Sequence, residues 1–411
     1  LSEGKITDYL DRALKRGLTY NSLERAILNI NDNPNISAKA SLEPGDETGE
    51  TRIVLDVTEG QFVTYSTSFN NHGSRYTGKN RATFNSTFNN PRSNGDKLDL
   101  VLSKSEDDFE SFEIRYNFPF GNDGLRIETS YNYFDYKIGK ELASSKILGD
   151  SENFKLKARY PIQRTSLKSL FVDVNYEQKY LYSETAGAAT SDKELRNYSL
   201  GLEWNNTDNL LGGGFTQIKP TMFFGDLDLS KVASSLSSDQ SGARTNGSFE
   251  KTVLDISRIQ KMTDKINLHF FGTTQFASKN LDSSEKLSLG GPAGVRAYPV
   301  GEATGDEGFR YSVDAKYNVI KPKYFDQVTA SVFYDYGQVT QYTDLTNLSV
   351  SNNTYSLEGY GIGFEAMKGE NISLKATFAK AIGGNPGASS GKNTDGLADD
   401  EQLFISLNIK F

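Results

Sequence analysis

The chain has 411 residues, no cysteine, 53 acidic against 45 basic side chains, and a mean hydropathy of −0.54. The absence of cysteine excludes disulfide bonds and thiol chemistry, and the net charge of −8 argues against a general nucleic-acid-binding protein. No stretch approaches the roughly 20 consecutive apolar residues of a membrane helix. A β-barrel would escape that test, because only alternate residues of its strands face lipid.

Residues 1–60 differ from the rest of the chain and predict a small α-α-β-β unit. Its expected elements are helices at 6–14 and 23–31 and strands at 36–42 and 52–57. Asn21 or Ser22 is expected to cap the second helix. Asn33-Pro34 ends it, because this dipeptide favours a turn.

From residue 61 to residue 411 the pattern has period two. Apolar and polar residues alternate over 125–133, 170–177 and 403–411, and apolar-out, polar-in segments of about ten residues are typical of a transmembrane barrel. About sixteen such segments start near residues 61, 78, 96, 109, 124, 151, 167, 194, 213, 247, 265, 309, 326, 354, 371 and 401. Abundant Tyr and Phe (22 and 25) with only 3 Met also fit an outer-membrane barrel. The predicted fold is therefore all-β: a transmembrane antiparallel β-barrel of about 16 strands, preceded by a small N-terminal α+β domain.

The connections between these segments alternate in length, as expected for short periplasmic turns and long external loops. Long polar connections include 185–192, 228–246 and 280–308. An even strand count places both barrel ends on the periplasmic side, where the 1–60 unit would lie. The segment 280–308 is then the sixth external loop, and its part 287–308 holds six glycines and two prolines.

The sixth loop contains residues that favour an inward fold over a disordered surface loop. Val295, Ala297 and Tyr298 are apolar enough to favour burial. Arg296 among them would then need a buried acidic partner. We therefore expect this loop to fold into the barrel lumen.

Two carboxylates on the neighbouring strands face the same lumen if the alternation holds. These are Asp314 and Asp335, and either could pair with Arg296. Phe333 and Gly337 share the lumenal face with Asp335. A wet lumen would screen such a pair, so removing one partner is expected to cost only about 1–2 kcal/mol.

The last strand carries a possible insertion signal. Leu407, Ile409 and Phe411 alternate with polar residues and end the chain on an aromatic side chain. This pattern suits recognition by barrel-assembly machinery before the strands meet outer-membrane lipid.

Several of these motifs resemble those of two-partner secretion transporters (TpsB type), which belong to a superfamily of barrels with periplasmic POTRA domains. The segment 295–298 (VRAY) resembles the VRGY pattern of the sixth loop, and 333–337 (FYDYG) resembles the F-x-D-x-G strand motif. Residues 70–78 resemble the first-hairpin motif, with Asn70 where Asp is more usual. The resemblance covers essentially the whole chain. It implies that Arg296 pairs with Asp335 and locks the loop inside the barrel.

The resemblance also implies a role for the N-terminal unit. Residues 1–60 resemble the second POTRA domain without its first strand, and a plug helix, a linker and a first POTRA domain would be expected upstream. The family's partner is a secreted TpsA-type exoprotein, which the POTRA region would bind by adding a strand to an exposed edge. The client-binding residues implied in this way are Leu23, Ile27, Ile36, Leu42, Ile53 and Leu55.

The sequence offers little support for an enzyme. The two histidines, His72 in an expected loop and His269 on a lumenal face, have no defensible Ser-His-Asp spacing. Without cysteine and with two distant histidines, no transition-metal site is expected, and the pattern implies no cofactor. Nucleotide is absent outside the inner membrane, so export would run without its hydrolysis.

Three readings of a non-enzymatic barrel stay open. The leading one is a pore that translocates a large unfolded exoprotein from periplasm to cell surface. The alternatives are a barrel-insertion machine of the same superfamily and a diffusion porin, although a porin leaves residues 1–60 unexplained. The client could be an adhesin, a haemolysin, a haem-scavenging protein or a contact-dependent toxin.

Overall fold

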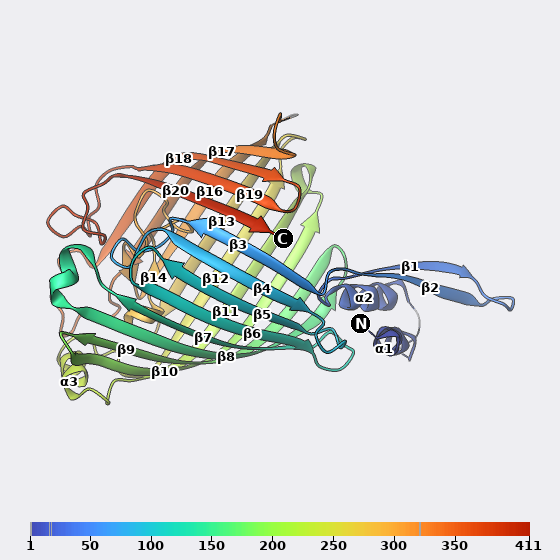
Figure 1. Cartoon of the computed structure of the whole chain (residues 1–411), viewed down its shortest axis with the longest axis horizontal. Helices are drawn as coiled ribbons and strands as arrows, with labels where there is room; N and C mark the ends of the chain where they lie inside the picture. Colours follow the sequence, from blue (N-terminus) through green and yellow to red (C-terminus); the bar gives the residue numbers. More distant parts are fainter. Residues whose placement is uncertain (1, 16, 18, 320–321) are drawn as a thin grey trace.

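The computed structural model describes residues 2–15, 17, 19–319 and 322–411. Sixteen antiparallel strands close into one barrel, which confirms the predicted fold class (Figure 1). Its strands are β3 (Val63–Asn70), β4 (Arg81–Asn89), β5 (Lys97–Ser105), β6 (Phe109–Pro119), β7 (Arg126–Lys137), β8 (Ile147–Arg164), β9 (Lys168–Thr185), β10 (Ala188–Asp208), β11 (Gly214–Asp228), β12 (Gly247–Lys261), β13 (Ile266–Ala277), β16 (Glu307–Asn318), β17 (Gln327–Thr340), β18 (Thr354–Lys368), β19 (Ile372–Ala381) and β20 (Glu401–Lys410). Each strand pairs with its sequence neighbour in the barrel, and β20 closes it on β3 through the pairs from Ser406–Asn70 to Lys410–Ser66.

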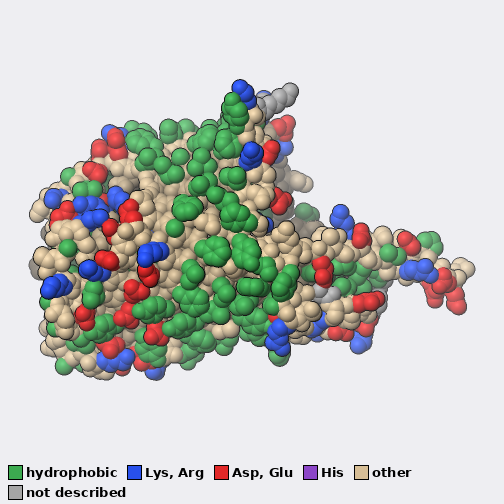
Figure 2. Space-filling view, in the orientation of Figure 1, with side chains coloured by type: hydrophobic (Ala, Val, Ile, Leu, Met, Phe, Trp, Pro, Cys, Tyr) green, Lys and Arg blue, Asp and Glu red, His purple; other side chains and the backbone are tan. Residues whose placement is uncertain are grey.

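The predicted facing of the strands holds. Val174 and Val332, expected to face lipid, are 55% and 60% exposed on the outer wall. Asn175, expected to face the lumen, donates to the Ser199 hydroxyl inside the barrel. Figure 2 shows the hydrophobic side chains gathered over the barrel wall, with charged side chains concentrated toward the end that carries the long loops. An apolar outer band of this kind is what a lipid bilayer requires.

The two barrel ends differ, as the loop lengths predicted. One end, here called the turn end, carries short turns and the N-terminal unit; the other, the loop end, carries the long connections (Figure 1). The loop-end connections contain short elements: η1 (Lys140–Ser145), α3 (Ala233–Ser241), η3 (Ser283–Glu285), β14 (Leu287–Ser288) and β15 (Thr304–Gly305); η2 (Leu210–Gly212) lies in a turn.

One expected loop is wrong. The segment 185–192 is a two-residue hairpin, because β9 runs to Thr185 and β10 starts at Ala188. Ala186 and Gly187 both have positive φ (53° and 84°), as a tight hairpin turn of this kind demands. Because small residues on either side of the turn obscure the strand pattern, the sequence predicted shorter strands than the observed β8, β9 and β10.

The N-terminal unit has the expected α-α-β-β order: α1 (Glu3–Lys15), α2 (Tyr20–Asn31), β1 (Ile36–Pro44) and β2 (Thr51–Glu59). The expected cap is corrected, because the N-cap of α2 is Thr19. Its hydroxyl accepts from the Ser22 backbone N–H, and the Ser22 side chain accepts from the Thr19 backbone N–H. Tyr9, Ile30, Ile36 and Ala38 form a small core between the helices and the hairpin.

The helices of this unit dock on turn-end residues of the barrel. Arg25 donates to the Pro161 carbonyl at 2.7 Å, and Arg164 pairs with Asp32 at 2.7 Å. Arg12 also pairs with Asp123, again at 2.7 Å. These contacts hold the unit against the β6–β9 side of the barrel, while the β1–β2 hairpin projects away from it (Figure 1).

Candidate functional site: a loop locked inside the barrel

The connection between β13 and β16, residues 278–306, folds into the lumen as expected. Its neck is the short pairing of β14 with β15. Beyond the neck the chain turns tightly, and the Val295 N–H donates to the Leu289 carbonyl at 2.7 Å. Gly294 is required here, because a Cβ at this position would meet that same carbonyl.

Arg296 lies at the tip of this loop and binds both candidate carboxylates at once. Its Nε donates to Asp335 Oδ2 at 2.8 Å and its Nη2 to Asp335 Oδ1 at 2.7 Å. Its Nη1 and Nη2 donate to Asp314 at 3.0 and 2.7 Å. The backbone N–H of Arg296 also donates to Asp335, and Ser312 accepts from Nη2. We call Arg296, Asp314 and Asp335 the tip lock.

Phe333 supports the tip lock from the same strand as Asp335. The guanidinium carbon of Arg296 lies 3.4 Å from the centroid of the Phe333 ring. Cation–π contact of this kind strengthens when it is desolvated. The four residues therefore form one compact arrangement of charge and ring.

The tip lock is dry, which corrects the expectation of a screened pair. Arg296 is 8% exposed, Asp314 7% and Asp335 0%. Breaking a buried pair leaves the remaining charge uncompensated, so the cost is larger than for a wet one. Removing one partner should thus cost about 3–5 kcal/mol, above the roughly 1–2 kcal/mol expected from the sequence.

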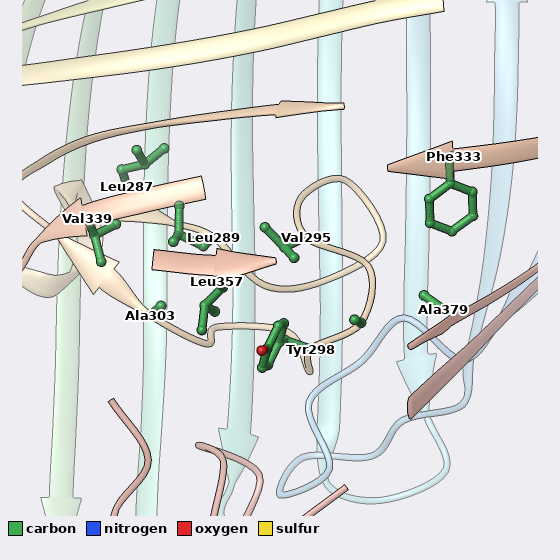
Figure 3. Packing of buried hydrophobic residues seen from close by; sticks show 10 residues of the cluster. Leu287, Leu289, Val295, Tyr298, Ala303, Phe333, Val339, Leu357 and Ala379 are labelled. Atoms are coloured by element: carbon green, nitrogen blue, oxygen red, sulfur yellow. The ribbon is translucent and has the colours of Figure 1, made fainter. Parts of the chain in front are cut away.

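Water is excluded by an apolar cluster that loop and wall form together (Figure 3). The loop contributes Leu287, Leu289, Val295, Ala297, Tyr298 and Ala303, and the wall contributes Phe333, Val339, Leu357 and Ala379. The wall residues occupy lumenal positions where a barrel normally carries polar side chains. The predicted burial of Val295, Ala297 and Tyr298 therefore agrees with the structure.

Two wall glycines make room for the loop. A Cβ at Gly337 would lie 2.7 Å from a Leu289 methyl, and one at Gly359 would lie 2.6 Å from the Ala297 Cβ. Gly337 was identified from its motif, whereas Gly359 carried no sequence signal. Its role appears only when β18 is placed beside the loop.

Glu302, which no sequence pattern indicated, ties the loop to the β19–β20 connection. Glu302 is 1% exposed. Its carboxylate accepts hydrogen bonds from the Thr394 N–H and hydroxyl at 2.6 and 2.9 Å, and from the Asn385 amide at 2.8 Å.

A second bridge joins two other connections at the loop end. Arg75 of the β3–β4 connection pairs with Glu141 of the β7–β8 connection at 2.7 Å. That hydrogen bond lowers the pKa of Glu141 to about 2, so the carboxylate stays charged at a lower pH than an ordinary glutamate would.

The residues proposed to bind a client divide into two groups. Ile36 is buried in the small core of the N-terminal unit, and Ile27 and Leu55 pack against that core. Leu23 and Ile53 are half-buried, whereas Leu42 is 59% exposed on the projecting hairpin. Direct contact with a client is therefore possible at Leu42, while buried Ile36 can only support the hairpin.

The proposed insertion residues lie at the seam where β20 meets β3. Leu407 pairs with Phe69 and Ile409 with Thr67. Phe411 is 61% exposed, and its N–H donates to the Tyr65 carbonyl at 2.8 Å.

In the described part of the chain no cluster of three or more His, Asp or Glu side chains is arranged to hold a metal ion. The described residues also include no helix long and apolar enough to span a membrane.

Comparisons with known proteins agree with this architecture. A model of the haemolysin secretion/activation protein family ShlB/FhaC/HecB matches residues 49–366. The heme/hemopexin transporter protein HuxB of Haemophilus influenzae (strain 86-028NP) is 27% identical over 388 residues, which cover 94% of this chain and 66% of HuxB. CdiB from Escherichia coli superposes with a TM-score of 0.80 at 19% identity, covering 96% of this chain and 71% of that one. BamA from Haemophilus ducreyi lacking POTRA domains 1–3 gives 0.59 at 15% identity, over 96% and 79%.

Proposed function

Because the chain belongs to the haemolysin secretion/activation protein family ShlB/FhaC/HecB and forms an outer-membrane barrel, we propose that it exports a large unfolded exoprotein without nucleotide hydrolysis. The observation that carries this proposal is the tip lock. A loop tied to the wall by one arginine and two carboxylates can fill a wide lumen in one state and vacate it in another. Barrels of sixteen strands are wide enough for an aqueous channel when nothing fills them.

The N-terminal unit is proposed to be the client-binding POTRA region, on the periplasmic side. In the described residues β1 pairs only with β2, so its other edge has no strand partner. An open edge of this kind can accept an extended segment of another chain by main-chain hydrogen bonds. The docking of α2 on the turn end, through Arg25 and Arg164, would hold that edge close to the channel entrance.

The client is proposed to be a TpsA-type exoprotein. The chain spans 66% of HuxB, whose name assigns it heme/hemopexin transport. A haem-scavenging protein is therefore one candidate client, alongside an adhesin, a haemolysin and a contact-dependent toxin. The barrel-insertion alternative rests only on a shared fold with BamA, and a diffusion porin would not need the docked N-terminal unit.

The test is transport into vesicles. The protein is reconstituted in liposomes, and an unfolded TpsA-type exoprotein from the same organism is added without nucleotide. We expect protease-protected exoprotein to accumulate inside vesicles whose barrels are inserted with the N-terminal unit outward. Accumulation that requires ATP, or that also occurs with an unrelated unfolded β-helical protein, would contradict the proposal.

A matched deletion tests the N-terminal unit. Removing residues 2–60 should abolish accumulation and leave the single-channel conductance in planar bilayers unchanged. If transport continues after the deletion, the unit has no recognition role.

We further propose that Phe411 directs assembly of the barrel in the outer membrane. Its position beside Tyr65 at the closing seam motivates this role. Deleting Phe411 should lower the amount of heat-modifiable barrel on gels, while Phe411→Tyr should not. An unchanged amount after the deletion would exclude the role.

A further inference from the structure

The sixth loop touches the barrel at a second place that the tip lock does not explain. Its first part, residues 280–286, lies against β9, β10 and β12, whereas the tip lies against β16, β17 and β18. We call this first part the stem. Among the described residues, the ion pairs and apolar cluster of the stem involve other wall residues than those of the tip.

Two stem carboxylates bind lysines of that wall. Asp282 pairs with Lys193 of β10 at 2.6 Å. Glu285 pairs with Lys179 of β9 at 2.8 Å and with Lys251 of β12 at 2.6 Å. The side chains of Asp282 and Glu285 are 7% and 3% exposed, so these carboxylates are as buried as those of the tip lock. Of their lysine partners, Lys251 is the most buried, at 10% exposed.

The charges of the stem are the reverse of those at the tip. At the tip one loop cation lies between two wall carboxylates, and at the stem Glu285 lies between two wall lysines. If the loop departs, Asp314, Asp335 and Lys251 lose their loop partners, whereas Lys179 keeps Glu177 of its own strand at 3.5 Å. The wall thus carries two separate charged seats for the same loop.

An apolar seat accompanies the stem. Leu281 is 1% exposed and packs with Leu195, Leu227, Leu229 and Phe249. Leu195, Leu227 and Phe249 lie inside the barrel wall, at positions where a water-filled lumen favours polar side chains. Burial of Leu281 accounts for these apolar residues, as burial of the tip accounts for Phe333 and Leu357.

The base of the loop separates the two seats. Lys286 pairs with Asp306 at 2.7 Å, and Asp306 also accepts from the Leu281 and Thr343 N–H groups. This cluster ties the start of the loop to its end. The stem can therefore stay seated while the tip beyond the neck moves.

We propose that Asp282 and Glu285 form a second, independently releasable anchor that keeps the loop-end half of the sixth loop seated when the tip lock opens. Asp282 and Glu285 are positioning residues. The loop would then leave the lumen in two steps. Opening the tip lock alone clears only the part of the lumen that the tip fills, while the stem stays in place. The inference concerns the placement of the loop and does not rest on the proposed client.

The experiment uses the full chain, whose lack of cysteine allows single reporters. Leu281→Cys reports on the stem and Val295→Cys on the tip, since both positions are buried. Each reporter is combined with Glu285→Gln, with Lys251→Gln, with Arg296→Ala, or with a control, Asp399→Asn. The control makes the same charge change as Glu285→Gln, on an exposed residue of the β19–β20 connection. Labelling rates with a membrane-impermeant maleimide are measured on intact cells, after heat-modifiability on gels confirms assembly.

We expect Glu285→Gln and Lys251→Gln to speed labelling of the stem reporter at least about tenfold. Glu285→Gln leaves buried Lys251 without its carboxylate partner, and Lys251→Gln leaves Glu285 with Lys179 alone. The tip reporter should change less than about twofold in these variants. Arg296→Ala should give the converse pattern, and Asp399→Asn should change neither rate.

Two results would overturn the inference. Equal acceleration of both reporters by Glu285→Gln would mean that the loop releases as one body. An unchanged stem reporter in both Glu285→Gln and Lys251→Gln would mean that these ion pairs do not hold the stem.

Discussion

The strands β16–β18 and β7–β9 follow the same alternation of inward and outward side chains. Their lumenal faces nevertheless differ, because one is apolar and the other is charged. On β16–β18 the inward positions hold Phe333, Val339 and Leu357, all buried against the loop. On β8 and β9 they hold ionic side chains such as Lys155 and Glu177, beside a cavity of about 260 Å³. A side chain's position in the alternation therefore determines whether it points into the lumen. Whether that part of the lumen excludes water depends on the seated loop.

The same difference separates strong from weak ion pairs. Arg296 and its carboxylates are nearly inaccessible, whereas the Lys155 side chain that pairs with Glu177 at 3.0 Å is 53% exposed. Exposed pairs contribute little, because water and salt screen them. How firmly the loop is held therefore depends more on the burial of each ion pair than on the number of ion pairs in the lumen.

Removing the tip arginine should have the largest effect on the difference between the dry and the wet part of the lumen. Arg296→Ala should destabilise the seated tip by about 3–5 kcal/mol, because it leaves two buried carboxylates without a cation. Hydrogen exchange of the 294–298 amides, measured by mass spectrometry, should accelerate more than about a hundredfold. Asp335→Ala should have a similar effect, and the double variant should be no worse than either single one. Protection that survives in Arg296→Ala would mean that the apolar cluster alone holds the loop.

The outer wall provides the next largest effect. Val332→Arg places a charge on the lipid-facing side of β17 and should cost about 2–4 kcal/mol near the bilayer midplane. Asn175→Arg, on the lumenal side of β9, should be tolerated. Urea titration of the barrel refolded into lipid vesicles measures both, and equal costs would show that the assigned facing is wrong.

A milder change separates the two carboxylates of the tip lock. Asp314→Asn keeps the shape of the side chain and leaves Asp335 paired with Arg296, so the cost should be about 1–2 kcal/mol. Exchange of the 294–298 amides should rise by less than in Asp335→Ala. The reverse ranking would make Asp314 the main partner.

The smallest effect is expected in the open part of the lumen. Lys155→Gln removes an exposed partner of Glu177 and should change stability by less than about 1 kcal/mol. The matched change Lys251→Gln, at a buried pair, should cost more. If the two variants unfold at equal urea midpoints, burial does not determine how much each ion pair contributes to stability.

The sequence predicted the features that depend on local pattern. Period-two alternation indicated the strands and placed Asp314 and Asp335 on the lumenal side, and motif resemblance selected Asp335 as the partner of Arg296. The pattern left the two carboxylates as alternatives. The structure shows that Arg296 binds both, because a guanidinium offers donors along more than one edge.

What escaped prediction depends on which distant segments meet. The dryness of the tip lock comes from Leu289, Leu357 and the room left by Gly359, and none of these carries a signal until the loop is seated. The hairpin at 186–187 was missed because small residues flank it. Glu302 was missed because its partners lie on a connection more than 80 positions along the chain.

The sixth loop lies inside the barrel with its tip buried, and chemical labelling from outside the cell distinguishes this placement from an exposed loop. Val295→Cys and Ser390→Cys, one at the buried tip and one on an exposed external connection, are each labelled on intact cells with an impermeant maleimide. We expect Val295→Cys to react at least about a hundredfold more slowly than Ser390→Cys, because the loop must leave its seat first. Comparable rates at the two positions would place the tip outside the barrel and exclude a buried sixth loop.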